Sequence, residues 1–147
     1  MANAPGVYIC SGCSIGEALD TAKLAKIAKA EFKVPRCEVH PFLCSPEGVA
    51  LIRRDLSDGV VDSVVIAACS PRVKTDAFAF DPTMVLDRVN IREHVAWCQK
   101  PNDEDTQMMA EDYLRMGITK ARKSEPLEPA HDEISKTLLV VGGGVTG

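Results

Sequence analysis

The residues best suited to chemistry in this sequence are its cysteines. Cys10 and Cys13 lie close together at the end of an apolar run, in GVYICSGCSIG. Their CxxC spacing fits a redox dithiol, half of a zinc site or part of an iron–sulfur cluster. The six cysteines of the chain are completed by Cys37, Cys44, Cys69 and Cys98. The start of the sequence lacks a basic leader, so we expect a cytoplasmic, reducing environment, where cysteines serve metals or redox chemistry more often than disulfides.

Composition sets further limits on the function. The chain has 147 residues, of which 46% are hydrophobic and 26% charged, with a net charge of −4. Those values are typical of one globular domain with a real core. The negative charge argues against nucleic acid as a partner, and no apolar run reaches the length of a membrane span.

Strand and helix patterns alternate along the sequence. Continuous or short apolar runs predict strands at 6–10, 37–40, 62–69 and 84–90. Helical spacing of apolar residues predicts helices from Asp20 to about residue 32, from Ser45 to about residue 56 and over 103–123, and Ser70-Pro71 is expected to open a helical turn. The alternation predicts an α/β domain: a small three-layer Rossmann- or flavodoxin-like fold with a mostly parallel four-stranded sheet.

The organisation along the chain has three parts. Residues 5–122 are expected to form the α/β domain, and the proline-containing, charged segment 123–136 to be a linker. Residues 137–147, TLLVVGGGVTG, combine an apolar strand pattern with Gly142-x-Gly144-x-x-Gly147. This is the first half of a dinucleotide-binding unit, whose helix would begin after Gly147, so we expect no dinucleotide binding by residues 1–147 alone.

The predicted topology brings most of the cysteines together. Ligands of parallel α/β sheets gather at the carboxyl ends of the strands. Cys37 begins its strand and is expected at the opposite edge. The cysteines expected to follow the carboxyl ends are Cys10, Cys13, Cys44, Cys69 and Cys98. Such convergence is what a thiolate-bound cluster needs, and it tolerates wide spacing in sequence.

Other chemistry has weaker support. Cysteine-only zinc sites usually have two CxxC pairs, whereas this chain has one, and a dithiol has no need of Cys44, Cys69 and Cys98. His40 and His94 are interpreted as surface or supporting groups, and His131 lies in the linker. No arrangement typical of hydrolases is present.

Six stretches, in order along nearly the whole chain, carry a family resemblance: GVYICSGCSIG, FLCSPEGVALIRRDL, VVIAACSPR, NIREHVAWC, AEDYLRMGITKAR and LLVVGGGVTG. Together they resemble the N-terminal domain of HdrA, one of the subunits of heterodisulfide reductase. They also resemble its relatives in the quinone-interacting complex of sulfate reducers and in the related complex of sulfur oxidisers.

The resemblance implies an electron-transfer module with one 4Fe–4S cluster, in an iron–sulfur flavoprotein oxidoreductase of the HdrA-like family. It implies FAD in the full-length protein, bound at Gly142, Gly144 and Gly147. It also implies other subunits of such a complex as partners and allows a homodimer of the longer protein. The piece considered alone is not expected to be catalytic.

Two departures leave the ligand set open. In the family the first two cysteines are one residue apart, whereas Cys10 and Cys13 are two apart. The family also has a cysteine at the position of Val95, whereas in this chain the cysteine comes three positions later, as Cys98. Four of the five converging cysteines are expected to bind the cluster, with Cys44 and Cys69 ranked first. Expected supporting groups are Ser70, Arg72, Arg92 and the backbone amides after Gly12. The alternative function is a docking domain, with zinc or no metal at the cysteines, that joins the flavin domain to partner subunits.

Overall fold

The computed structural model describes residues 4–126, 128 and 132–145. Within them, four parallel strands form one sheet in the order β2-β1-β3-β4. The strands are β1 (Pro5–Cys10), β2 (Arg36–His40), β3 (Ser63–Ala68) and β4 (Val85–Asn90). The predicted fold class is therefore confirmed, with every strand parallel.

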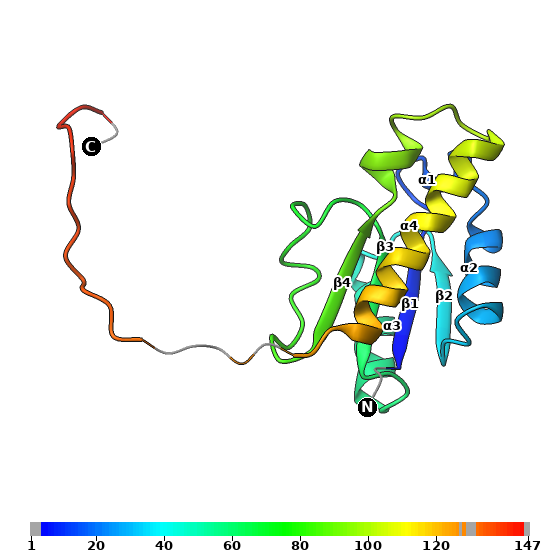
Figure 1. Ribbon diagram of the computed structural model, residues 1–147, viewed down its shortest axis with the longest axis horizontal. Helices are drawn as coiled ribbons and strands as arrows, with labels where there is room; N and C mark the ends of the chain where they lie inside the picture. Colours follow the sequence, from blue (N-terminus) through cyan, green and yellow to red (C-terminus); the bar gives the residue numbers. More distant parts are fainter. Residues whose placement is uncertain (1–3, 127, 129–131, 146–147) are drawn as a thin grey trace.

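Helices cover both faces of this sheet. α2 (Thr21–Ala30) and α4 (Glu104–Lys123) pack together on one face, and α3 (Pro46–Ser57) lies on the other (Figure 1). The predicted helix starts hold, since the side chains of Asp20 and Ser45 accept hydrogen bonds from the backbone N–H groups of Lys23 and Gly48. Two short elements were not predicted: α1 (Ile15–Ala18) and the π-helical turn η1 (Arg92–Ala96).

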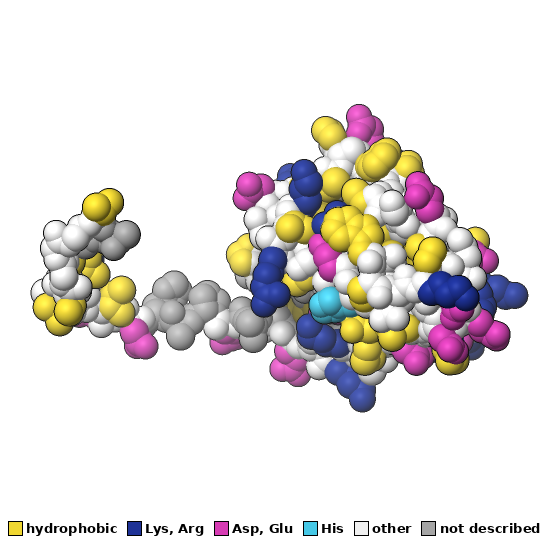
Figure 2. Space-filling model, turned by 90° about the horizontal axis from the view of Figure 1, so that it is seen from above, with side chains coloured by type: hydrophobic (Ala, Val, Ile, Leu, Met, Phe, Trp, Pro, Cys, Tyr) yellow, Lys and Arg dark blue, Asp and Glu magenta, His cyan; other side chains and the backbone are white. Residues whose placement is uncertain are grey.

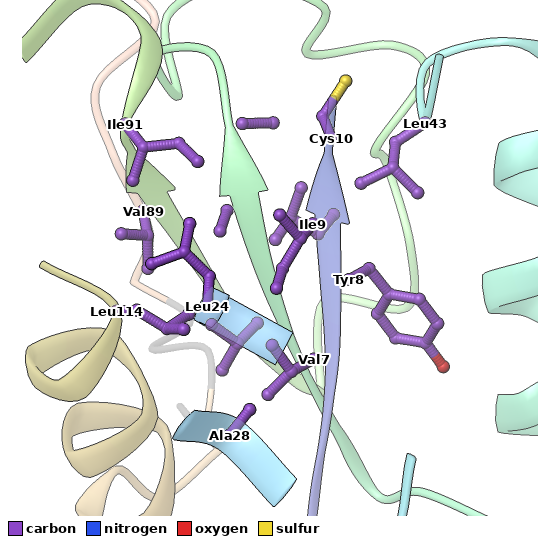
Figure 3. Close-up of a cluster of buried hydrophobic side chains, with 14 of the residues drawn as sticks. Val7, Tyr8, Ile9, Cys10, Leu24, Ala28, Leu43, Val89, Ile91 and Leu114 are labelled. Carbon is purple, nitrogen blue, oxygen red and sulfur yellow. The ribbon is translucent and has the colours of Figure 1, made fainter. Parts of the chain in front are cut away.

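The core explains why the central strands are apolar throughout. Every residue of β1 and β3 is buried, because helices lie on both sides of these strands. In Figure 3, Val7 and Ile9 point from β1 toward Leu24 and Leu114, whereas Tyr8 points to the other face. Cys10 lies at the upper end of the same strand, where the core gives way to the carboxyl edge.

A polar network links the sheet to α3 on the face that this helix covers. The Tyr8 hydroxyl donates to Asp55 Oδ2 at 3.0 Å, and Arg36 Nε donates to the same oxygen at 2.9 Å. Burial, together with the hydrogen bond to Asp55, raises the pKa of Tyr8. The network fastens the C-terminal part of α3 to β1 and β2.

Two local features need comment. Ser70-Pro71 opens a single turn, in which Val73 N donates to the Ser70 carbonyl oxygen at 3.1 Å, and no helix follows it. Arg88 donates to the Cys69, Ser70 and Val73 carbonyl oxygens of the same loop. Leu138–Val141 pairs with none of the described strands and has no strand structure here, since a strand needs a neighbour for its backbone hydrogen bonds. That residues 137–147 begin a dinucleotide-binding domain of a longer protein stays a prediction. Gly147 and His131 lie outside the described residues.

No helix among the described residues is both long and apolar enough to cross a membrane.

Candidate metal centre

Four thiols line one cavity at the carboxyl edge of the sheet. They come from four positions along the chain: the end of β1, the turn before α1, the turn before α3, and the end of β3. They are Cys10, Cys13, Cys44 and Cys69. The rest of the wall is mainly apolar, from Ile15, Phe42, Leu43, Ala68 and Phe78, with Lys74 and Arg92 as its cationic members.

Cys10 is held at the base of this pocket. Only 8% of its surface is exposed, and its sulfur lies 3.6 Å from the Pro41 carbonyl oxygen. Burial raises the pKa of the Cys10 thiol, while hydrogen bonds from the backbone N–H groups of Leu43 and Gly12 act in the opposite direction. Those two amides are therefore placed to stabilise a thiolate, and they belong to Gly12 and Leu43 rather than to the residues directly after Gly12 that were predicted from the sequence.

Cys13 occupies an unusual backbone conformation. Its φ is 52° and that of the next residue, Ser14, is 66°, so both lie in the left-handed region. This region costs about 1–2 kcal/mol for a residue with a Cβ. Trp97 Nε1 donates to the Cys13 carbonyl oxygen at 3.0 Å and holds the turn in place.

Gly12 allows the two cysteine-bearing loops to touch. A Cβ at Gly12 would lie 2.1 Å from the Pro41 carbonyl oxygen and 2.9 Å from the Phe42 ring. Any side chain there would push the loop carrying Cys13 away from the loop carrying Cys44. The common pocket therefore depends on a glycine at this position.

Cys69 directly follows β3 and is buried. Arg88 Nη2 donates to its sulfur and to its carbonyl oxygen, each at 3.3 Å. The loop after Cys69 is fastened a second time by Glu93, whose Oε2 accepts from Ser70 N at 2.8 Å. Burial opposes ionisation of Glu93, but Arg92 and the Ser70 amide outweigh it and lower its pKa.

The remaining cysteines do not line the pocket. Cys98 follows η1, is exposed, and its thiol donates to the His94 carbonyl oxygen at 2.9 Å. Cys37 lies near the start of β2, buried beside Val7, and burial raises its pKa to about 11. Neither His40 nor His94 lines the pocket: His40 Nδ1 accepts from the Phe42 amide, and His94 packs edge-on against Tyr113.

Of the two arginines predicted to support the cluster, one lines the pocket and the other does not. Arg92 lines the pocket, whereas the Arg72 side chain is exposed and only its backbone N–H is bonded, to Ser70 Oγ. Sequence reasoning missed Arg88 and Glu93. Arg88 lies beside Asp87 in a predicted strand, and no sequence pattern singled it out.

The four pocket thiols do not form a compact site for a single ion. Among the residues that the structure describes, no three His, Cys, Asp or Glu side chains form a group that could hold one metal ion. The donor set is nonetheless four soft sulfurs around one apolar cavity. Such donors suit zinc and iron–sulfur centres rather than magnesium or calcium.

Exposed aromatic groups border the pocket. Phe42 and Trp97 are 55% and 57% exposed. Figure 2 looks onto this side of the molecule, and hydrophobic side chains gather near its middle with charged groups around them.

The fold and the pocket define a class of protein: an all-parallel α/β domain with four thiols at its carboxyl edge. Comparison with known proteins is more specific. The chain is homologous to part of HdrA, the heterodisulfide reductase component that the sequence motifs indicated. No family model matches it.

Three relatives illustrate the match, each covering 97% of this chain. The HdrA protein of the ferredoxin/F420H2-dependent CoB-CoM heterodisulfide reductase from Methanosarcina acetivorans is 35% identical over 150 residues, which are 19% of that protein. An iron-sulfur HdrA protein of the CoB–CoM heterodisulfide reductase from Methanopyrus kandleri is 33% identical, over 23% of its length. An HdrA-like protein of Archaeoglobus profundus is also 33% identical, over 21%. The chain thus spans about a fifth of the length of the curated relatives that it matches.

Proposed function

We propose that this chain is an electron-transfer module that holds one 4Fe–4S cluster through Cys10, Cys13, Cys44 and Cys69. The observation that carries the proposal is the lining of one cavity by these four thiols, from four separate positions in the sequence. When bound, such a cluster stores and passes on single electrons.

The residues around the thiols suit a buried anionic centre. Leu43, Ile15 and Phe78 are almost fully buried and give the cavity apolar walls that exclude water. Lys74 and Arg92 supply positive charge, and no Asp or Glu of the described residues lines the cavity. A cluster with four thiolate ligands carries net negative charge, so cationic rather than acidic neighbours favour its binding.

The sequence predicted four ligands among five cysteines, and we take the four that line the pocket. Cys98 lies outside the pocket lining, with its thiol bonded to the His94 carbonyl. We therefore assign the fourth place to Cys10, whose sulfur is buried and faces two backbone amides. In the sequence ranking, Cys10, Cys13 and Cys98 competed for two places.

The relatives' names support a place in a larger redox protein. One relative is named an iron-sulfur subunit of heterodisulfide reductase. We propose that this chain is the N-terminal domain of such a cytoplasmic oxidoreductase subunit, and that it works with other subunits of the complex. In the longer protein, residues from 137 onward would open an FAD-binding domain, with Gly142, Gly144 and Gly147 at its first glycine turn.

Serine variants test the ligand set. Cys10→Ser, Cys13→Ser, Cys44→Ser and Cys69→Ser should each lose most of the iron or leave a three-iron form, because a thiolate ligand is removed. Cys98→Ser and Cys37→Ser, the matched controls, should keep full iron content. Iron analysis and EPR spectra of anaerobically purified protein give the answer. Full iron content in Cys10→Ser together with loss of iron in Cys98→Ser would mean that Cys98, and not Cys10, is the fourth ligand.

A docking domain is the second candidate, favoured by the exposure of Phe42 and Trp97 beside the pocket. The visible spectrum separates the two functions. A broad absorption band that bleaches with dithionite supports the cluster. Colourless protein with one zinc per chain supports the docking domain.

A further inference from the structure

Two arginine side chains lie against the cysteines of the proposed cluster. Arg88 comes from β4, and its Nη2 lies 3.3 Å from the Cys69 sulfur. Arg92 comes from η1 and lines the pocket itself, beside the Cys13 sulfur. The two guanidinium groups thus approach two different thiols of the set.

Arg88 also shapes the loop that follows Cys69. Its Nη2 donates to the Cys69, Ser70 and Val73 carbonyl oxygens at 3.3, 3.0 and 3.1 Å. The guanidinium stacks on the Phe78 ring, 4.5 Å from its centre. A single planar group therefore fixes both ends of the 69–73 loop and one wall of the pocket.

Arg92 is held in a comparable way. Its Nη2 donates to Glu93 Oε1 at 2.7 Å, and its guanidinium lies 4.4 Å from the centre of the Trp97 ring. Burial acts to lower the pKa of Arg92, but Glu93, Cys13 and Cys69 outweigh it. The side chain is thus charged and fixed in position rather than free in solvent.

Both arginines also carry an unpaired polar atom. Across the described part of the chain, the buried side-chain nitrogen and oxygen atoms without a hydrogen-bond partner are Arg88 Nε and Arg92 Nε. Burying a charged group with an unpaired donor is costly, so packing alone does not account for two such residues at one site. A strongly anionic occupant of the pocket would offset that cost.

We propose that Arg88 is a positioning residue that raises the reduction potential of the cluster through Cys69, with Arg92 acting in the same direction beside Cys13. The inference rests on the proposed function, since it presupposes a cluster in this pocket. Reduction adds one negative charge to the cluster. A fixed positive charge and an N–H donor at a ligand sulfur stabilise the reduced state more than the oxidised one.

Arg88→Met tests the proposal, with Arg72→Met as the matched control. Arg72 lies in the same loop, but its side chain is exposed. Iron content and the midpoint potential are measured for each variant by anaerobic titration followed by EPR. We expect Arg88→Met to hold iron and to have a more negative potential than wild type, while Arg72→Met stays close to wild type.

Two further variants keep the test decisive where Arg88→Met is too unstable to purify. Arg88→Lys retains the charge but not the planar fork, so it should restore most of the potential and less of the loop's thermal stability. Arg88→Gln retains a hydrogen-bond donor without the charge, so its midpoint potential should lie between those of Arg88→Met and wild type. A potential that is the same in wild type, Lys and Gln variants would overturn the inference.

Different results would contradict the proposed function and the inference about Arg88. Wild-type protein without iron after anaerobic reconstitution would overturn the cluster and this inference with it. Wild-type protein that holds a cluster with a potential insensitive to residue 88 would overturn the inference alone.

Discussion

Cys13 shows how the site is built at the scale of single residues. It and Ser14 are consecutive residues with positive φ, although neither is glycine. Strained backbone of this kind persists only where the surroundings determine it, and it concentrates at functional sites. Here the Trp97 indole and the close approach at Gly12 hold the turn, and the result is a cysteine that lines the shared pocket.

Cys37, in contrast, is buried in the core away from the pocket, and its raised pKa predicts how stability depends on pH. Burial raises its pKa from 9.0 to about 11, so its thiol stays protonated in the folded chain when an unfolded chain has begun to ionise. The contribution of the protonated Cys37 thiol to the free energy of unfolding is therefore fully present below pH 9 and is lost as the pH rises through 11. The loss should amount to about 2–3 kcal/mol at most.

Urea unfolding of iron-free protein between pH 7 and 11 measures this loss. Cys37→Ala should flatten the fall in unfolding free energy relative to wild type, whereas Cys98→Ala, which removes an exposed thiol, should not. Tyr8, whose pKa is also raised, adds an alkaline loss that is common to all three proteins. Parallel curves for wild type and Cys37→Ala would contradict the assigned pKa shift.

At the scale of elements, the contact between α4 and the sheet depends on Gly117. A Cβ there would lie 2.2 Å from Val89 Cγ2 and 3.1 Å from Asp87 Oδ2. Helix propensity alone would make Gly117→Ala stabilising by about 1 kcal/mol. We expect the reverse, a loss of about 1–3 kcal/mol, because α4 must move away from β4.

The sign of the change in urea unfolding free energy decides between the two effects. Met116→Ala, at an exposed neighbouring position of α4, is the control and should change stability by less than about 0.5 kcal/mol. Gly117→Ala with stability above that of wild type would show that α4 packs on β4 with room for a methyl group.

Sequence patterns predicted the elements whose causes are local. Asp20 and Ser45 cap their helices through hydrogen bonds within three residues, and the apolar run of β3 reflects burial on both faces. The contact that fixes the loop after Ser70 could not be predicted in this way, because its donor, Arg88, is 18 residues further along the chain. Cys98 was expected at the same edge by topology, but its place outside the pocket depends on the π-helical turn η1, which no sequence pattern indicated.

At the scale of the whole molecule, the α/β domain and the segment after α4 differ in packing. The described residues 132–145 lie away from the sheet (Figure 1). Leu138, Leu139 and Val141 are 84%, 85% and 89% exposed, so they add little to the core of the domain. Consecutive exposed apolar residues of this kind favour association with other surfaces.

A chain shortened to residues 1–126 tests this division. Its thermal midpoint should stay within about 2 °C of that of the full chain, since the described apolar residues among those removed are exposed. Iron content should also be unchanged, because the proposed ligands all precede residue 126. Circular dichroism and iron analysis provide the measurements, and light scattering should show less association for the shortened chain. A midpoint lowered by several degrees would mean that the segment packs on the domain in solution and that the domain extends beyond residue 123.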